Sequence, residues 1–240
     1  MFKFKKNWLI LIFVSLIMIF GHCDCSIKFI SYGEKTTTKY DVVKESTKAA
    51  YCVEIYKDAT LEKLMVIASA FGFSKDCDKN RSKYIMTAGH VCSHPGDFLI
   101  MVKNKSGERF KAEIVETRDK PDLCMLKINY NQPAICLSEE EPQQGDRVVI
   151  IGHYRFFFPF MQEGFISTVS KEFIVTSNIA LPGTSGSMLI NEEGKLVGLL
   201  SMIRIERQLN PIILYEHGGI FCSWYAIKKF VKEINEKGSS

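Results

Sequence analysis

Between about residues 48 and 222, short apolar runs alternate with polar positions and are separated by turn residues. The runs are rich in β-branched and aromatic side chains, as half-buried strands are, and breakers such as 104–107 and 191–194 lie between them. About a dozen strands at this spacing predict an all-β barrel or sandwich. The expected strands are 53–56, 64–73, 84–87, 98–102, 112–115, 123–128, 147–151, 164–169, 173–175, 188–190 and 196–203.

The end of the chain carries the one pattern that is typical of a helix. Over 224–234 the apolar residues recur at every third or fourth position, and Ser223 is suited to cap the first turn. The stretch 134–145 contains a proline and three consecutive glutamates, which is typical of a polar link between two halves.

The amino terminus has the three parts of a secretory signal. Three lysines in the first six residues precede an apolar run over 8–20, and small residues suited to cleavage end at Cys23. The run is shorter than the roughly 20 residues that span a bilayer. We therefore expect residues 1–23 to be a signal peptide and the protein to be secreted or extracytoplasmic. The alternative is a membrane anchor over 7–21, and only then would a membrane be a partner.

Composition and charge exclude several classes. The chain is 46% hydrophobic and 24% charged, which excludes a wholly disordered or collagen-like protein. The net charge is +4, but residues 1–23 contain three lysines and no acid, so the remainder carries only +1. A nucleic-acid partner is not expected, because such proteins need a basic face to neutralise phosphates.

The chain has eight cysteines. If the protein is exported, we expect some of them to form disulfides, because the compartment is oxidising. Their connectivity is open, and Cys124, in an apolar strand, could equally be a free buried thiol. No pair of closely spaced cysteines is matched by a second pair or by histidines, so no zinc site is expected.

Three segments carry candidate chemistry. His90 ends an apolar strand that runs into small residues, Asp122 opens another apolar strand, and Ser185 lies in a glycine turn. A serine hydroxyl is a weak nucleophile that needs an imidazole to take its proton, and the imidazole needs a carboxylate to fix its tautomer. The developing oxyanion needs convergent N–H donors, which a glycine turn supplies.

Each of these residues has competitors nearby. Asp119 lies in a charged turn that solvent would satisfy, whereas Asp122 abuts the strand. Ser187 is the other serine of the glycine turn. The remaining histidines, which do not follow an apolar strand and a small-residue turn, are His22, His94, His153 and His217.

The three segments resemble the motifs of chymotrypsin-like (trypsin-fold) serine proteases, which occur in the same order. The matching stretches are 87–90, 122–127 and 183–187, and 181–186 with 194–198 is similar to the HtrA/Deg-like branch. The resemblance covers roughly residues 50–230. It implies two six-stranded antiparallel β-barrels with a C-terminal helix. The implied layout is an N-terminal tail over 24–47 and a peptidase domain over 48–240, with barrels at about 48–133 and 146–222, a linker at 134–145 and a helix at 223–236.

The resemblance also implies roles. His90 would be the general base and then acid, Asp122 its orienting partner and Ser185 the nucleophile, with the backbone N–H groups of Gly183 and Ser185 as the oxyanion hole. No metal or organic cofactor is implied. Ser187 departs from the family's usual second glycine. Thr184 stands where trypsin-like zymogens carry an aspartate, so we expect no activation through that ion pair.

The same resemblance suggests a specificity pocket. The stretch 198–203 is similar to the strand that pairs with substrate and walls the pocket, so Ser201, Met202 and Ile203 are candidate substrate contacts, with Ile179 beside them and Gly219 opposite. No acid is positioned to receive Lys or Arg. We expect cleavage after small or medium apolar residues.

Three further expectations concern the rest of the chain. HtrA relatives carry a downstream PDZ domain, for which we expect no room here. Cys136 resembles a linker cysteine that some relatives tie to an amino-terminal tail, with Cys25 as the partner to test. The run 154–160 holds four phenylalanines, which could be core or an exposed patch.

Together these features predict a secreted serine endopeptidase that acts on polypeptides. The alternative is a catalytically silent protein of the same fold that serves as a binding module. The oligomeric state is left open.

Overall fold

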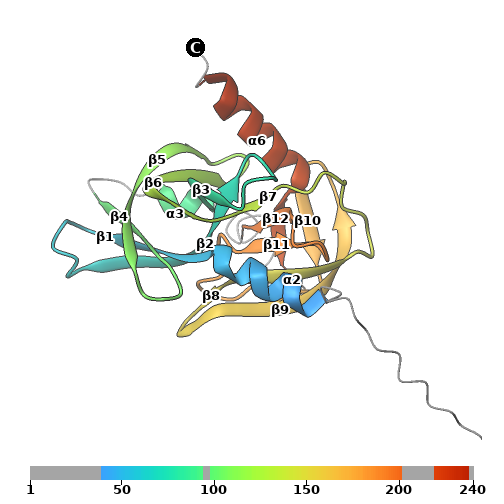
Figure 1. Cartoon of the computed structure of the whole chain (residues 1–240), viewed down its shortest axis with the longest axis horizontal. Helices are drawn as coiled ribbons and strands as arrows, with labels where there is room; N and C mark the ends of the chain where they lie inside the picture. The colour runs from blue at the N-terminus through green and yellow to red at the C-terminus, as the bar shows by residue number, and fades with distance from the viewer. Residues whose placement is uncertain (1–38, 94–97, 202–218, 238–240) are drawn as a thin grey trace, which may run out of the picture. The chain divides into compact units, whose positions relative to one another are not determined.

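The computed structural model describes residues 39–93, 98–201 and 219–237 (Figure 1). The expected signal peptide, the candidate pocket residues Met202 and Ile203, and Cys25 lie outside these residues. Within the described ranges, no helix has the length and apolar character needed to cross a membrane.

The first barrel is a closed, antiparallel sheet of six strands. Its order is β1-β4-β5-β6-β3-β2, and the pairing of β1 with β2 closes it. Inward-facing side chains such as Val53, Phe71 and Met125 are fully buried. The strands are β1 (Ala50–Tyr56), β2 (Leu64–Ser74), β3 (Arg81–Thr87), β4 (Leu99–Lys103), β5 (Arg109–Arg118) and β6 (Leu123–Pro133).

The second barrel is also closed and antiparallel, in the order β10-β13-β12-β11-β8-β9. Two six-stranded barrels with a C-terminal helix confirm the expected fold class. The strands are β8 (Arg147–Tyr154), β9 (Phe157–Val169), β10 (Phe173–Thr176), β11 (Met188–Ile190), β12 (Leu196–Leu200) and β13 (Ile220–Ser223).

The C-terminal helix α6 (Trp224–Lys237) packs against both barrels. Ser223 caps it as expected, because its Oγ accepts the N–H of Ala226 at 3.1 Å. Ile227 and Phe230 of its apolar face are fully buried and join the core of the first barrel. An ion pair between Arg118 and Glu233 fastens the helix to β5.

A buried carboxylate lies on β1 of the first barrel. Glu54 of β1 accepts hydrogen bonds from Lys103, from Arg109 Nε at 2.7 Å and from the Tyr56 hydroxyl at 2.9 Å. Burial acts to raise the pKa of Glu54, but these donors outweigh it and lower the pKa to about 2. The group is therefore an ionised, fully paired anion at neutral pH.

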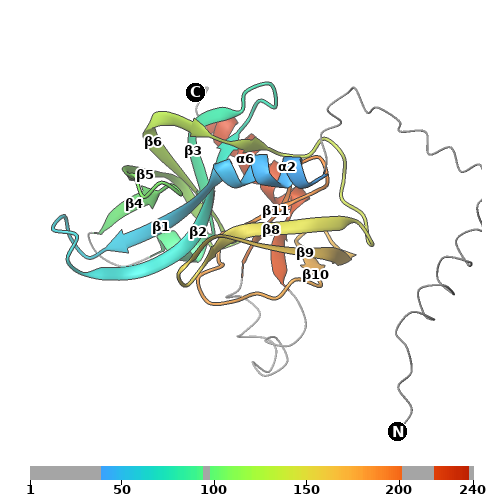
Figure 2. The ribbon, with the colours of Figure 1, turned by 60° about the horizontal axis from the view of Figure 1, so that its bottom comes forward.

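Four short elements were not expected from the sequence. Helix α2 (Lys39–Ser46) and a 3₁₀ turn (Thr47–Ala49) precede β1, helix α3 (Gly89–Cys92) follows β3, and β7 (Ile135–Cys136) lies within the expected polar link. Each is too short for a periodic pattern, and each is stabilised by tertiary contact. Helix α2, for example, lies against the turn between β11 and β12 (Figure 2), where a Cβ on Gly194 would be 2.8 Å from Ser46 Oγ.

The disulfides correct two expectations. Cys136 is bonded to Cys77 and so is not the partner of Cys25, and Cys124 is bonded to Cys92 and so is not a free thiol. The parallel pairing of β2 with β7 places Ser74 opposite Cys136, and the turn after β2 then brings Cys77 to it. Among the described cysteines, Cys52 and Cys222 are buried and form no disulfide.

Candidate active site

His90 and Asp122 meet because their strands are neighbours. β3 and β6 are antiparallel with Thr87 opposite Cys124, so His90, just past the end of β3, faces Asp122, just before β6. His90 Nδ1 is 2.8 Å from Asp122 Oδ2, and the main-chain N–H of His90 donates to Asp122 Oδ1 at 2.7 Å. Both carboxylate oxygens therefore hold the histidine.

The carboxylate of Asp122 has further partners. Its side chain is 6% exposed, the Ser201 hydroxyl donates to Oδ2, and the Cys222 thiol lies 3.4 Å from the Asp122 main-chain oxygen. Burial acts to raise the pKa of Asp122, but the hydrogen bonds and charge of His90, together with Ser201, lower it below its usual range. Asp122 is ionised at neutral pH, whereas Asp119 is an exposed turn residue.

The turn that carries Ser185 is fixed by backbone hydrogen bonds. Ser69 N–H donates to the Ser185 oxygen at 2.8 Å, and Gly186 N–H donates to the Leu200 oxygen at 2.8 Å. Gly186 has φ +84°, and a Cβ there would be 2.2 Å from the Ser69 oxygen and 2.4 Å from Thr87 Oγ1. The turn thus lies directly against the end of β3, three residues before His90, and only glycine fits this approach.

A continuous set of contacts joins the three segments. Gly186 is bonded to Leu200, and the next residue, Ser201, donates to the carboxylate that holds His90. The side chain of Ser185 is partly exposed. Among the described residues its hydroxyl makes no hydrogen bond with His90, so the structure brings the candidate nucleophile to the neighbourhood of the base without a direct bond.

The main-chain N–H groups of this turn differ in their partners. Those of Thr184, Gly186 and Ser187 donate to the carbonyls of Leu181, Leu200 and Thr184 at 2.8–3.0 Å. Those of Gly183 and Ser185, the two expected oxyanion-hole donors, have no acceptor within the residues that the structure describes. Two such donors in one turn, without an acceptor in the described part of the chain, are the groups that an anion or carbonyl oxygen would need.

The serine that departs from the family pattern is accommodated by a glycine on another strand. Ser187 is buried, and its Oγ has no hydrogen-bond partner among the residues that the structure describes. A Cβ on Gly152 would lie 1.9 Å from that oxygen, so the hydroxymethyl group occupies the space that Gly152 leaves open. No local pattern indicates this pairing, because β8 and the turn are far apart in the chain.

The candidate pocket residues are only partly described. Ile179 is 43% exposed, and its N–H donates to Gln162 Oε1 at 2.9 Å. Gly219 is buried, and its oxygen accepts the N–H of Thr176 at 3.0 Å. The side chain of Ser201, a candidate substrate contact, instead points to Asp122. This role was missed because nothing near Ser201 in the sequence indicates a partner 79 positions away.

The aromatic run forms the tip of the β8–β9 hairpin and the start of β9. Phe156 is 98% exposed and Phe157 is 64% exposed, whereas Phe158 and Phe160 are half-buried. The run is therefore divided between surface and packing. Phe158 packs near His153, whose buried Nδ1 has no hydrogen-bond partner in the described part of the chain. No cluster of three or more His, Cys, Asp or Glu side chains suited to a metal ion occurs among the described residues.

Comparisons with known proteins agree with this architecture. A family model described as the trypsin-like peptidase domain matches residues 68–199. The chain is 31% identical over 130 residues to a probable periplasmic serine endoprotease (DegP-like) of Halomonas elongata, covering 50% of this chain and 27% of that protein. It is 28% identical over 145 residues to the serine endoprotease DegS of Haemophilus influenzae, covering 55% of this chain and 42% of that protein.

A solved structure shares the fold. The serine endoprotease from Yersinia pestis superposes with a TM-score of 0.66 at 24% identity, over 85% of this chain and 69% of that one. The chain spans only about a quarter to two fifths of the length of the two curated relatives.

Proposed function

Because the chain belongs to the trypsin-like peptidase domain family, we propose that it is a serine endopeptidase that hydrolyses peptide bonds of a polypeptide substrate through Ser185, His90 and Asp122. The observation that carries the proposal is the buried His90–Asp122 pair, linked through Ser201 to the turn that holds Ser185. The names of the relatives, which are serine endoproteases, support the same reaction class.

The geometry suggests how each group would act. The Nδ1–H of His90 donates a hydrogen bond to Asp122. This leaves Nε2 free to take the proton of the Ser185 hydroxyl as this oxygen attacks the scissile carbonyl. The N–H groups of Gly183 and Ser185, which have no acceptor among the described residues, would bind the oxyanion. His90 would then protonate the leaving amine and activate the water that hydrolyses the acyl-enzyme.

We also propose where and on what the enzyme acts. Periplasmic relatives and the signal-like residues 1–23 support an extracytoplasmic location. The apolar, exposed side chain of Ile179 supports cleavage after small or medium apolar residues. A peptide library that shows strict cleavage after Lys or Arg would contradict this preference.

A catalytically silent binding module is the second candidate. It is favoured by one observation, the lack of a hydrogen bond between the Ser185 hydroxyl and His90 within the described residues. Apo proteases often form this bond only with substrate, so the observation does not outweigh the His90–Asp122 pair.

A fluorophosphonate probe separates the two candidates, because it labels only a serine whose proton an adjacent base removes. We expect the folded protein to be labelled, Ser185→Ala to lose the label and Ser187→Ala to keep it. Ser187 lies in the same turn and is the matched control. Absence of labelling in protein whose circular dichroism shows a folded β structure would support the binding module.

A further inference from the structure

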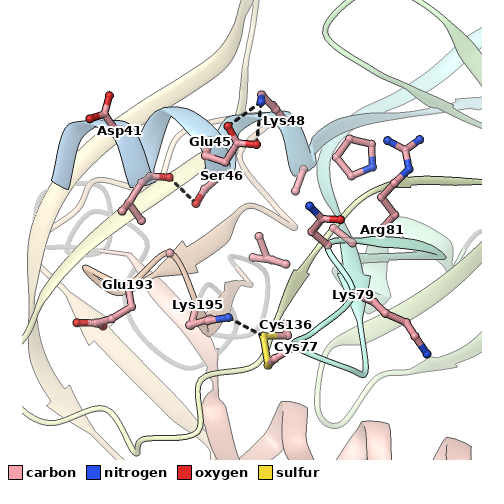
Figure 3. A pocket seen from close by; sticks show the side chains of 17 residues that line it. Asp41, Glu45, Ser46, Lys48, Cys77, Lys79, Arg81, Cys136, Glu193 and Lys195 are labelled. Atoms are coloured by element: carbon pink, nitrogen blue, oxygen red, sulfur yellow. Dashed lines mark hydrogen bonds and ion pairs between the residues drawn. A yellow bond between two sulfur atoms is a disulfide. The ribbon is translucent and has the colours of Figure 1, made fainter. Parts of the chain in front are cut away.

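A cavity of about 580 Å³ lies away from the candidate active site, and His90, Asp122 and Ser185 are not among its lining residues. Its walls come from α2, the turn between β2 and β3, β7 and the turn between β11 and β12 (Figure 3). The Cys77–Cys136 disulfide forms part of the wall. A reactive bond is therefore presented to a space large enough for a small peptide.

The two sulfurs of this disulfide differ in access. Cys77 is exposed, whereas Cys136 is 5% exposed. Exchange requires a thiolate to reach one sulfur while the other leaves. Attack is therefore directed to Cys77, and Cys136 is the leaving group.

A lysine is positioned to assist that departure. Lys195 Nζ lies 3.3 Å from Cys136 Sγ, and within the described part of the chain its contact is with this sulfur and not with a carboxylate. An adjacent cation stabilises a thiolate and lowers the pKa of the thiol, and a leaving thiol of lower pKa departs faster. The contact between Lys195 and Cys136 thus favours the departure of Cys136 as a thiolate when Cys77 is attacked.

The charges of the cavity are arranged with opposite signs on opposite sides. In Figure 3, Lys195 lies next to the disulfide, Lys79 and Arg81 lie to its right, and Asp41 and Glu193 lie to its left. Lys48 is ion-paired with Glu45 at 2.6 Å and Lys79 with Asp76 at 3.2 Å, whereas within the described residues neither Arg81 nor Lys195 has a carboxylate partner. A thiol ligand with carboxylates for Arg81 and Lys195, and with an ammonium for the acidic side, would match this arrangement.

From these observations we propose that the cavity binds a small zwitterionic peptide thiol with an excess of carboxylates, and that Cys77 is its site of S-thiolation. The thiol loses its proton to solvent, and the thiolate attacks Cys77 Sγ. A new disulfide forms between ligand and Cys77 as the bond to Cys136 breaks. The electron pair leaves on Cys136 Sγ, beside the Lys195 ammonium. One disulfide is exchanged for another, so no external oxidant or reductant is needed.

The test uses glutathione as the probe on non-reduced protein, with alkylation of released thiols and peptide mapping by mass spectrometry. We expect glutathione on Cys77 and the alkyl group on Cys136, at a rate that saturates with glutathione concentration. The Cys92–Cys124 disulfide is an internal control: both sulfurs are buried, so it should stay intact. Adducts that appear equally on both disulfides, or no adduct at all, would overturn the proposal.

Two comparisons isolate the lysine and the charges. Lys195→Met should slow the exchange roughly threefold for each unit by which the lysine lowers the thiol pKa. Lys105→Met, at an exposed turn, is the matched control and should react like the parent protein. Cysteamine, which has the ammonium but no carboxylate, should react without saturation. Unchanged rates in Lys195→Met, or saturation by cysteamine, would contradict the assignment. Ser185→Ala should react normally, so this test is separate from that of the proposed function.

Discussion

Replacing Asp122 by asparagine tests the assignment of the site most directly. Asp122 Oδ1 accepts the main-chain N–H of His90, while Oδ2 accepts the imidazole Nδ1–H and the Ser201 hydroxyl. The asparagine side chain has only one oxygen for these donors. If that oxygen keeps the main-chain N–H, the new NH₂ faces Nδ1 and selects the tautomer that carries its proton on Nε2. Such an imidazole cannot take the proton of Ser185.

The loss of reaction rate in Asp122→Asn should be large, because the substitution disables the general base while the binding surface stays in place. Loss of the correct tautomer in a triad of this kind costs a factor of about 10⁴ in kcat, which corresponds to about 5.5 kcal/mol in activation free energy. The assay is the rate of fluorophosphonate labelling, followed by kcat once a peptide substrate is known. Asp119→Asn, at an exposed position three residues earlier, is the control and should label at the parent rate.

The same substitution has a predicted signature in stability. The pKa of Asp122 is below its usual range in the folded protein, so the ionised form contributes stability above the unfolded pKa of about 3.9, and this is lost as the pH falls through the folded pKa. Asp122→Asn should lose that part of the acid dependence. A labelling rate reduced less than about tenfold, in a folded variant, would refute the idea that this carboxylate orients the base.

Three further outcomes are expected. Ser201→Ala removes a hydrogen bond to Asp122 that is worth about 1.5–3 kcal/mol, so the labelling rate should fall about tenfold. The acid limb of the plot of labelling rate against pH should move to higher pH, and an unchanged plot would contradict this. Gly186→Ala should lower the free energy of unfolding in urea by more than Gly107→Ala does, because both glycines have φ +84° but only the former would clash, at 2.2 Å from a backbone oxygen. Glu54→Gln should lower the free energy of unfolding by about 2–3 kcal/mol at neutral pH and by little near pH 2. The reason is the folded pKa of about 2, because the stability from this carboxylate is lost as the pH falls from about 5. Melting temperatures of both proteins across this pH range check it.

Local pattern was enough to predict an all-β barrel or sandwich and the candidate residues at strand ends, whereas the two six-stranded barrels were expected from the family resemblance. The side chains of β4 alternate between buried and half-buried, and those of β12 are apolar and all buried. Both patterns can be recognised in the order of residues along the strand, and a closed barrel is one of the few ways to bury such strands. His90 could be found because it ends a strand, and Asp122 because it begins the neighbouring one. These features depend on a period of two and on turn residues, both of which are local.

Contacts that depend on how two distant segments lie against each other could not be predicted from local sequence pattern. The Cys77–Cys136 bond follows from the parallel pairing of β2 with β7, a strand of only two residues that has no pattern of its own. The fit of Ser187 against Gly152 depends on how the glycine turn lies on β8. A single sequence holds no signal for either, because each is a property of two segments placed together.

The carboxylate of Asp122 also connects the two barrels. Its hydrogen bonds come from His90, just past β3 of the first barrel, and from Ser201, just past β12 of the second. The Cys92–Cys124 disulfide cross-links the segments two residues beyond His90 and two beyond Asp122, so the first-barrel half of the site is held covalently. The second-barrel half is held to the first by the Ser201 hydrogen bond and by the Ser69 N–H of β2, which donates to the Ser185 oxygen at 2.8 Å. A change that loosens the packing between the barrels should therefore separate Ser185 from His90 while the His90–Asp122 pair stays intact.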